Sequence, residues 1–307
     1  MTDRILLLVT GSNNELKGCT FLMNTTDLPK TALITGTSSG IGLRAAIHLA
    51  QAGFMVIATM RDVAKAAPLR AAAQEAGVTI DVRPLDVQDD ASVTSCVQGV
   101  LTTYGHIDLL VNNAGAGYLG TLEQTPLTAL QSTMDTNFFG VWRLVQAVLP
   151  SMRVAGTGRI ITVTSVGGLI GQPFNDAYCA AKFAVEGFME SLAPVARRLG
   201  VTLTLIEPGP VNTEFVASVL AQAPPTSPEI QAAYGLMLDA YMGATEQTYA
   251  ALGQTPDQVA EVILNAATTA TPHFRYTTSP SIQNLVAQKY VDPTGDNLVA
   301  FFAARLP

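Results

Sequence analysis

The stretch TALITGTSSGIG, residues 31–42, decides the fold. It opens with a short apolar and β-branched run that is typical of a buried strand. Gly36, Gly40 and Gly42 follow directly, and residues 41–52 then have the composition of a helix that ends before Gly53. Glycines at such a turn let the backbone approach a phosphate group, and the first turn of the helix offers it free N–H groups. The stretch therefore predicts the first unit of an α/β domain that binds a dinucleotide.

The same alternation continues along the chain. Further strands are expected at 54–59, 79–83 with its end at 85–87, 107–111, 159–164 and 201–206, and further helices at 62–76, 91–104, 126–154 and 177–199. Such an order builds right-handed βαβ units and a parallel sheet with helices on both faces. We predict a single α/β domain at 29–307 with about seven strands. We interpret 213–255 as short helical pieces that form a substrate lid, and 1–28 as a flexible or peripheral extension.

Composition excludes several classes of protein. The formal net charge of −7 and the isoelectric point near 4.9 argue against partners such as nucleic acid or an anionic membrane. No apolar run reaches the roughly 18 residues that a transmembrane helix needs. The three cysteines, Cys19, Cys96 and Cys179, are scattered and lack the spacing of metal ligands. They fit a reduced, cytoplasmic protein without a metal site.

A second stretch, SVGGLIGQPFNDAYCAAK at 165–182, carries the candidate chemistry. Tyr178 and Lys182 are four residues apart in an alanine-rich segment, so both side chains lie on one face of a helix. A nearby ammonium group favours the phenolate and lowers the pKa of a tyrosine. Ser165 follows a strand and could polarise the same carbonyl oxygen that Tyr178 protonates as a hydride arrives. Alone, however, the tyrosine–lysine pair is also an ordinary feature of helices.

Two polar sites lie where a ligand could meet the sheet. NNAG at 112–115 follows the strand at 107–111, at the carboxyl edge where open α/β sheets bind ligands, although it could also be a plain turn. Asn137 falls in the middle of a predicted helix, where asparagine is a poor helix former. We interpret Asn137 either as a residue that holds a water molecule near the lysine or as a solvent-facing side chain.

Together, TGTSSGIG, NNAG, Asn137, Ser165 and YCAAK resemble the motifs of the short-chain dehydrogenase/reductase family over residues 30–270. The resemblance implies a Rossmann-like domain, a nicotinamide cofactor and a catalytic tetrad. Tyr178 would be the acid/base, and Ser165 would orient the substrate oxygen. Lys182 would hold the nicotinamide ribose and lower the pKa of Tyr178, with Asn137 positioning a water molecule. A homodimer or homotetramer formed through the helices at 126–154 and 177–199 is also implied. The alternative is a non-catalytic dinucleotide-binding protein on the same scaffold.

The resemblance also implies a set of cofactor-binding residues. Besides Tyr178 and Lys182, the set comprises Gly36, Ser38, Ser39, Gly40, Ile41, Gly42, Arg61, Asp86, Val87, Asn113, Ala114, Gly115, Pro208, Gly209, Val211 and Thr213. Within it, Asp86 and Val87 match the adenine contact, and Asn113 stabilises the central sheet. The stretch PGPVNT at 208–213 caps the nicotinamide.

The cofactor is expected to be NADP or NAD, and residues after the second strand bear on the choice. A carboxylate there binds the adenosine ribose of NAD, whereas an arginine accommodates the 2′-phosphate of NADP. The family's discriminating carboxylate aligns with Met60, and Arg61 suits a phosphate, as does the hydroxyl group of Ser38. Asp62 could instead bind the ribose, or it could only cap the next helix. We favour NADP.

Within the family, the chain resembles most the branch of estradiol 17β-hydroxysteroid and retinol dehydrogenases. The resemblance is carried by ATMRD at 58–62, residues 165–187, PGPVNT, PDQVAEVIL at 256–264 and FRYTT at 274–278. It implies a bulky apolar alcohol, most favourably a 17β-hydroxysteroid, with retinol as the alternative. The expected substrate contacts are Ser165 and Tyr178, with apolar walls from Val166, Leu169, Ile170, Pro173, Phe174, Val211, Phe215 and Leu236.

One departure concerns the far end of the steroid. The estrogen-specific member of the branch holds the far phenolic hydroxyl with a lid histidine, which aligns with Leu236 in this chain. The sequence therefore predicts that testosterone and androstenedione serve as well as estradiol and estrone.

Overall fold

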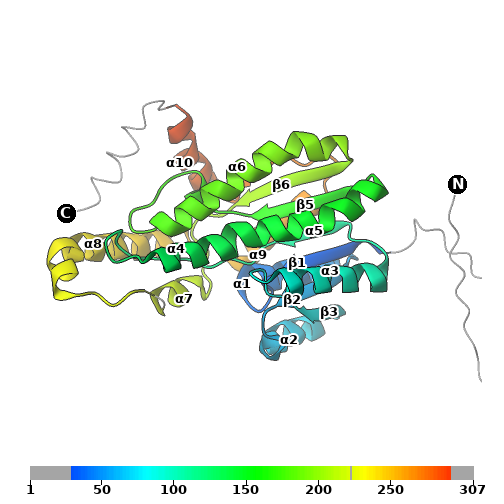
Figure 1. Cartoon of the computed structure of the whole chain (residues 1–307), viewed down its shortest axis with the longest axis horizontal. Coiled ribbons are helices and arrows are strands. Elements are labelled where there is room, and N and C mark those ends of the chain that lie inside the picture. Colours follow the sequence, from blue (N-terminus) through cyan, green and yellow to red (C-terminus); the bar gives the residue numbers. More distant parts are fainter. Residues whose placement is uncertain (1–28, 222, 292–307) are drawn as a thin grey trace, which may run out of the picture.

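The computed structural model describes residues 29–221 and 223–291. Its centre is a parallel sheet of seven strands in the order β3-β2-β1-β4-β5-β6-β7 (Figure 1). The strands are β1 (Thr31–Thr35), β2 (Met55–Met60), β3 (Ile80–Pro84), β4 (Leu109–Asn112), β5 (Gly158–Val163), β6 (Val201–Glu207) and β7 (Arg275–Thr277). The predicted single α/β domain with a parallel sheet is confirmed. Residues 1–28, interpreted above as an extension, lie outside the described part.

Helices cover both faces of the sheet, because each strand alternates large apolar residues toward two separate cores. One core packs β-strand residues against α1 (Gly40–Gln51), α2 (Ala67–Glu75) and α9 (Pro256–Thr268). The other packs them against α3 (Asp90–Tyr104), α5 (Gly140–Ala155) and α6 (Asp176–Arg198). A smaller apolar cluster joins the segment after β5 to α10 (Pro280–Tyr290). None of the described helices is long and apolar enough to cross a membrane.

The order in which strands are added to the sheet reverses after β3, when β4 pairs with the free side of β1, and this reversal sets the position of the ligand crevice. β1 pairs with β2 on one side and with β4 on the other, so the chain runs outward along the sheet in both directions from this point. In an open parallel sheet, the loops at the carboxyl ends of two such strands diverge and leave a crevice. The glycine-rich turn after β1 and the NNAG turn after β4 therefore meet at this crevice.

The helix predicted at 126–154 is not a single α-helix. It consists of α4 (Leu127–Met134), a π-helical turn η3 (Asp135–Phe139) and α5. The amide group of Asn137 donates from Nδ2 to the carbonyl oxygens of Thr133, at 2.9 Å, and Ala116, at 2.7 Å. These bonds satisfy a buried side chain that a regular helix would direct elsewhere. Inserted π turns are frequent at functional sites.

The helix predicted at 62–76 is also divided. Its first part is the 3-10 turn η2 (Val63–Ala66), and α2 begins only at Ala67. The carboxylate of Asp62 accepts a hydrogen bond from the backbone N–H of Ala64 at 3.0 Å and so caps the turn. Pro68, near the start of α2, has no N–H to continue a longer α-helix through this point.

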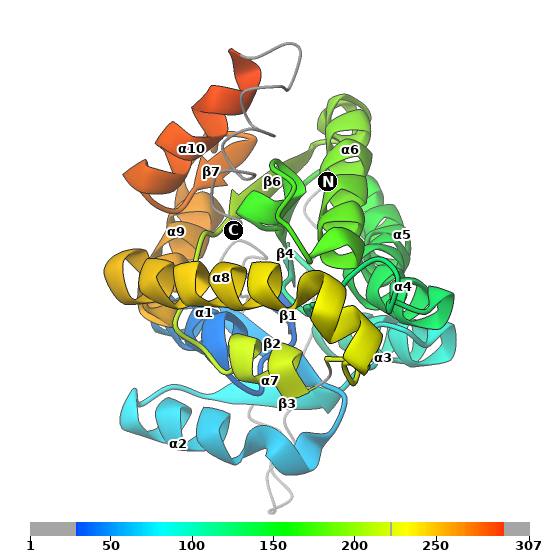
Figure 2. The ribbon, with the colours of Figure 1, turned by 90° about the vertical axis from the view of Figure 1, so that its left-hand side faces the viewer.

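The segment at 213–255 contains longer structure than the short helical pieces predicted. It forms α7 (Phe215–Ala221) and α8 (Pro228–Leu252), and α8 has 25 residues. The hydroxyl group of Ser227 caps α8 and Pro228 is at its first turn, which together favour a helix start. Both helices lie across the carboxyl ends of the strands, and they face the viewer in Figure 2.

Candidate functional site

The glycine-rich turn is packed so closely that its glycines cannot be replaced without displacement. A Cβ atom on Gly42 would lie 2.3 Å from the carbonyl oxygen of Gly36 and 2.4 Å from Nδ2 of Asn113. Gly36 itself has a φ of +69°, in the left-handed region that favours glycine. The N-cap residue of α1, Ser39, makes no side-chain capping bond, so the first N–H groups of the helix can serve a ligand. This cradle fits a pyrophosphate group.

Asn113 fastens the two turns to each other. Its Nδ2 atom donates to the carbonyl oxygens of Thr35, at 3.0 Å, and Gly36, at 2.9 Å. The backbone N–H groups of Asn113 and Ala114 both donate to Oγ1 of Thr35 at 3.0 Å. The side chain predicted to stabilise the central sheet thus joins the glycine turn to the NNAG turn.

Ser165 and Tyr178 lie together at the carboxyl edge of the sheet. Ser165 follows β5, and its Oγ atom accepts a hydrogen bond from the backbone N–H of Gly167 at 3.0 Å. This bond leaves the hydroxyl hydrogen of Ser165 available to another acceptor. Tyr178 lies in the first turns of α6, and its hydroxyl group is within hydrogen-bonding reach of Ser165. The predicted serine–tyrosine pair is therefore assembled by β5 and α6.

Lys182 lies one turn after Tyr178 and is buried. Its Nζ atom donates to the carbonyl oxygen of Val163 at 3.1 Å and lies 5.8 Å from the centroid of the Tyr178 ring. Burial lowers the pKa of Lys182 to about 8, and the carboxylate of Glu186 opposes this shift. The lysine is charged at neutral pH but holds its proton less firmly than an exposed lysine.

The expected lowering of the Tyr178 pKa is wrong for the chain by itself. Loss of hydration raises the pKa of this phenol well above its ordinary value, and the hydrogen bond from Ser165 offsets only part of that increase. The ring also packs against Phe215 of α7, with centroids 5.8 Å apart. Helical spacing places Lys182 near Tyr178, but it does not show how far the phenol is removed from water, to which contacts remote in sequence such as Phe215 contribute. Tyr178 is thus strongly held in its protonated, acid form.

Asn137 is fully buried and lies between the NNAG turn and the lysine. Its Oδ1 atom accepts from the backbone N–H of Ala116 at 3.2 Å, which with the two bonds from Nδ2 fixes the amide plane. A Cβ atom on Gly115 would lie 2.9 Å from Oδ1 of Asn137 and 3.6 Å from Nζ of Lys182. The glycine therefore keeps the space between these two polar groups open.

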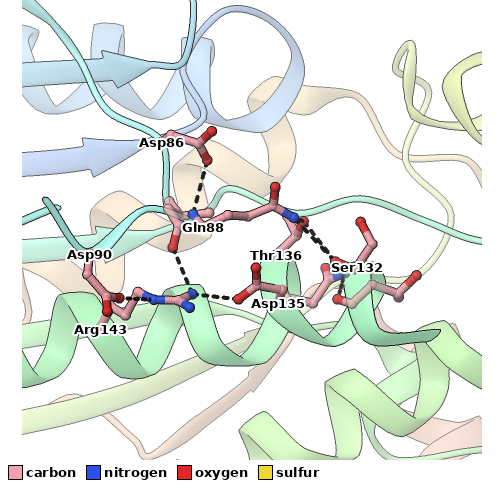
Figure 3. A network of polar contacts seen from close by, with 10 residues as sticks. Asp86, Gln88, Asp90, Ser132, Asp135, Thr136 and Arg143 are labelled. Atoms are coloured by element: carbon pink, nitrogen blue, oxygen red, sulfur yellow. Dashed lines mark hydrogen bonds and ion pairs between the residues drawn. The ribbon is translucent and has the colours of Figure 1, made fainter. Parts of the chain in front are cut away.

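The loop predicted to contact adenine is joined to the helix that carries Asn137. The network consists of Asp86, Gln88, Asp90, Ser132, Asp135, Thr136 and Arg143 (Figure 3). Arg143 of α5 donates to Asp90 at 2.5 Å and to Asp135 at 2.7 Å, and it also donates to the carbonyl oxygen of Val87 at 3.2 Å. The adenine-side loop and the π turn are therefore held in one fixed arrangement.

A pocket of about 340 Å³ opens at the end of β2. It is lined by Ser38, Met60, Arg61, Asp62 and Lys65. The structure thus brings the predicted residues Ser38 and Arg61 together. Lys65 was not predicted, although a basic residue one helical turn beyond a candidate phosphate ligand is a signal that could have identified it.

The 208–213 segment connects β6 to α7 and lies beside the glycine turn. The side chain of Thr213 approaches within 3.2 Å of the position that a Cβ atom on Gly40 would occupy. Val211 is buried and forms a parallel bridge with Gln254 at the end of the lid. Pro208 accepts a hydrogen bond from the N–H of Val166 at 2.8 Å. The predicted capping segment therefore lies against both the cofactor cradle and the segment after Ser165.

The predicted apolar walls divide into two groups. Phe174 and Phe215 are partly exposed and lie among lid residues, with Phe174 5.6 Å from Tyr241 of α8 by ring centroids. Leu236, also on α8, is 79% exposed. Pro173, next to Phe174, is also partly exposed. The second group, Val166, Leu169 and Ile170, is buried against Ile282 and Val286 of α10. These three side chains pack the core, and their predicted role as substrate walls has no support in the arrangement.

Comparison with known proteins assigns the family. The sequence model described as short chain dehydrogenase matches residues 30–224, more than half of the chain. This chain belongs to the short-chain dehydrogenase family. It is an oxidoreductase of that family.

Two curated relatives align with most of this chain. Retinol dehydrogenase 8 of Bos taurus is 44% identical over 88% of this chain and 88% of its own length. The 17-beta-hydroxysteroid dehydrogenase type 1 of Homo sapiens is 41% identical over 87% of this chain and 83% of its own. This short-chain dehydrogenase is therefore similar to retinol and to hydroxysteroid dehydrogenases, as the sequence predicted.

Solved structures of other short-chain dehydrogenases share the fold. One from Burkholderia phymatum, in complex with NAD, matches 86% of this chain and 94% of its own with a TM-score of 0.74 and 26% identity. A variant of actinorhodin polyketide ketoreductase with NADPH matches 85% and 100%, with a TM-score of 0.72 and 29% identity.

Proposed function

We propose that this short-chain dehydrogenase uses NADP to interconvert a hydroxysteroid and its ketosteroid at the 17β position. The observation that carries the proposal is the convergence of Ser165 and Tyr178 beside the aromatic ring of Phe215, at the edge of the sheet where the lid helices lie. Both relatives above bear names of dehydrogenases for bulky apolar alcohols, which supports the same substrate class.

The residues fit a nicotinamide dinucleotide. The turn at Gly36, Gly40 and Gly42 would hold the pyrophosphate, and the Asp86–Val87 loop would hold the adenine. When bound, the cofactor supplies or accepts a hydride at the substrate carbon. The ammonium group of Lys182 would hold the nicotinamide ribose, and the 208–213 segment would cover the nicotinamide.

Three side chains would then manage the proton. Ser165 holds the substrate oxygen through its hydroxyl hydrogen, since Gly167 already occupies one of its acceptor positions. Tyr178 gives its proton to that oxygen during reduction and takes it back during oxidation. The raised pKa keeps Tyr178 protonated until the substrate oxygen needs the proton, and a charged Lys182 near the ring would lower the cost of forming the phenolate. The open space between Asn137 and Lys182 suits a water molecule that replaces the proton.

The preference for NADP rests on charge in the pocket at the end of β2. Arg61 and Lys65 provide two cations there, and Ser38 adds a hydroxyl group. One oxygen of the competing carboxylate, Oδ1 of Asp62, is engaged as a helix cap by the N–H of Ala64, which leaves fewer acceptor positions for a ribose. A 2′-phosphate would pair with the two cations, whereas a bare ribose would leave them with Asp62 as the one counter-charge among the residues that line this pocket.

The preference for a steroid rests on the apolar rings of the lid. Burying a four-ring hydrocarbon gains about 25 cal/mol per Å² of apolar surface without many polar contacts. Phe215 offers a ring close to Tyr178. Phe174 offers a ring beside Tyr241 of α8, and Leu236 supplies an exposed apolar side chain on the same helix. Retinol is the second candidate, because it is also long and apolar and the similarity to a retinol dehydrogenase favours it.

A cofactor-linked absorbance assay tests the substrate. We expect turnover of testosterone and estradiol with NADP, and of androstenedione and estrone with NADPH. We also expect no strong preference for the aromatic A-ring, since Leu236 cannot accept a hydrogen bond from a phenol. Good turnover of retinal, with none of any 17β-hydroxysteroid or 17-ketosteroid, would replace the steroid by a retinoid.

We also propose that two copies associate through α5 and α6. Trp142 and Phe139 are 45% and 46% exposed, and Trp142 lies 4.6 Å from the ring of Phe188 on α6. An aromatic patch that spans two adjacent helices is typical of interfaces. We expect the chain to be a dimer by light scattering and Trp142→Lys to shift it to monomer. Leu252→Lys, at 48% exposure on α8, is the matched control and should leave the dimer intact.

A further inference from the structure

A cluster of buried carboxylates lies directly behind the catalytic lysine. Glu186, one turn beyond Lys182 on α6, and Glu207, the last residue of β6, are 5% and 1% exposed. Two carboxylates in the interior are costly unless charge or hydrogen bonds compensate them. The cation that compensates them comes from Arg275 of β7.

Arg275 contacts both buried carboxylates and an exposed one. Its Nε atom lies 3.1 Å from Oε2 of Glu186 and 3.2 Å from Oε1 of Glu207, and its Nη2 atom lies 2.6 Å from Oε2 of Glu190. The Nε–H group donates to Glu186, and Oε1 of Glu207 accepts no hydrogen bond. Thr164 Oγ1 also donates to Glu186, at 2.6 Å. Glu186 is therefore the better compensated carboxylate of the buried pair.

The two carboxylates consequently differ in charge. Burial and the neighbouring Glu186 raise the pKa of Glu207 to about 8, so that it is mainly protonated at neutral pH. Burial also raises the pKa of Glu186, while Thr164, Arg275 and Lys182 all lower it. Because Glu186 accepts hydrogen bonds from Thr164 and Arg275 whereas Oε1 of Glu207 accepts none, the negative charge of the pair is better stabilised on Glu186.

Glu186 also links elements that carry the chemistry. Through Thr164 it is tied to the end of β5, one residue before Ser165, and through its own helix to Lys182. Through Arg275 it reaches Glu207, which directly precedes the 208–213 segment. No other carboxylate in the described part of the chain has such bonds to the strand end that carries Ser165.

We propose that Glu186 is a positioning residue of the active site, whose charge, fixed by Thr164 and Arg275, holds Lys182 in its protonated form. The charged and titratable groups around Lys182 and Glu186 are Tyr178 and Glu190 on α6, Glu207 on β6, Arg275 on β7 and Lys289 on α10. Of these, Glu186 is the group whose charge raises the pKa of Lys182 against the effect of burial.

The test is a titration of Lys182 by NMR in the full chain labelled with carbon-13 at lysine Cε. The chain contains only five lysines, and the Lys182 signal is identified by its loss in Lys182→Arg. In Glu186→Gln a nearby negative charge is lost at almost unchanged volume, so the proton affinity of Lys182 should fall about three- to tenfold. The matched control is Glu190→Gln, which removes the exposed partner of the same arginine and should leave Lys182 unchanged.

An unchanged Lys182 titration in Glu186→Gln, or an equal fall in Glu190→Gln, overturns the proposal. A second test uses the wild-type chain, so it does not depend on the folding of a variant. With glutamate labelled at the carboxyl carbon, the Glu186 signal should be that of a carboxylate at pH 7, and a protonated Glu186 there overturns the proposal.

The inference rests on the role proposed for Lys182, but the titration needs no substrate. Failure to turn over steroids would leave the NMR result intact, and an unshifted Lys182 would leave the steroid assay intact. Where turnover is measurable, the midpoint of the high-pH limb of the oxidation rate, on which Lys182 loses its proton, should move to lower pH in Glu186→Gln. A residue with a purely structural role would lower the rate without moving this midpoint.

Discussion

Replacing Tyr178 by phenylalanine is expected to lower turnover about a thousandfold while cofactor binding is retained. The ring keeps its packing against Phe215, so the cleft keeps its shape, and only the proton donor is lost. Ser165 can still hold the substrate oxygen, but it has no neighbouring base that would make it an efficient acid. The measurement is kcat in both directions, together with the Kd of NADPH by fluorescence.

The control for this change is Tyr234→Phe on α8. The hydroxyl group of Tyr234 donates to Glu123 at 2.6 Å in an exposed position away from Ser165 and Lys182. The same chemical deletion there should leave kcat within about twofold, since surface substitutions of this kind cost little. Turnover of Tyr178→Phe close to that of the wild type would exclude Tyr178 as the acid/base.

Arg61→Ala is expected to lower kcat/KM for NADP about ten- to a hundredfold and to leave kcat/KM for NAD nearly unchanged. A hydrogen bond to a charged partner contributes about 1.5–3 kcal/mol, and 1.4 kcal/mol is a factor of ten. Arg61 is exposed at the mouth of the pocket, so the loss lies toward the smaller value unless Lys65 is removed as well. The measurement is the ratio of kcat/KM with the two cofactors.

The matched control is Arg70→Ala, an exposed cation on α2 that does not line this pocket. It should change kcat/KM for both cofactors equally and only slightly, because its effect is limited to long-range attraction of the anionic cofactor. A wild-type enzyme that prefers NAD strongly, or an Arg61→Ala variant that loses both cofactors equally, would contradict the proposed phosphate site.

Local sequence determined the elements and their order. The apolar run at 31–35, the glycines after it and the repeated alternation of strands and helices predicted the parallel sheet. The four-residue spacing of Tyr178 and Lys182 gave their common helix face. These features depend on backbone preference and side-chain period, which a short segment carries by itself.

Contacts between distant segments decided what the sequence could not. The π turn at Asn137 forms because its amide reaches Ala116, twenty-one residues earlier. Val166 and Leu169 pack against α10, more than a hundred residues later, a contact that the sequence around Ser165 does not indicate. No local pattern encodes such contacts, since they arise only when the sheet brings the elements together.

The charges and pKa values at the site also depend on contacts between distant segments. The sequence predicts that Lys182 lowers the pKa of Tyr178, whereas burial of the phenol in the folded chain raises it. The charge behind Lys182 depends on Glu186 meeting Arg275 eighty-nine residues later. The turn after β2 brings Lys65 to the pocket that Arg61 also lines. The sequence gives the type of each residue. Its pKa depends on how much water and which charges surround the side chain, and only the tertiary structure determines that environment.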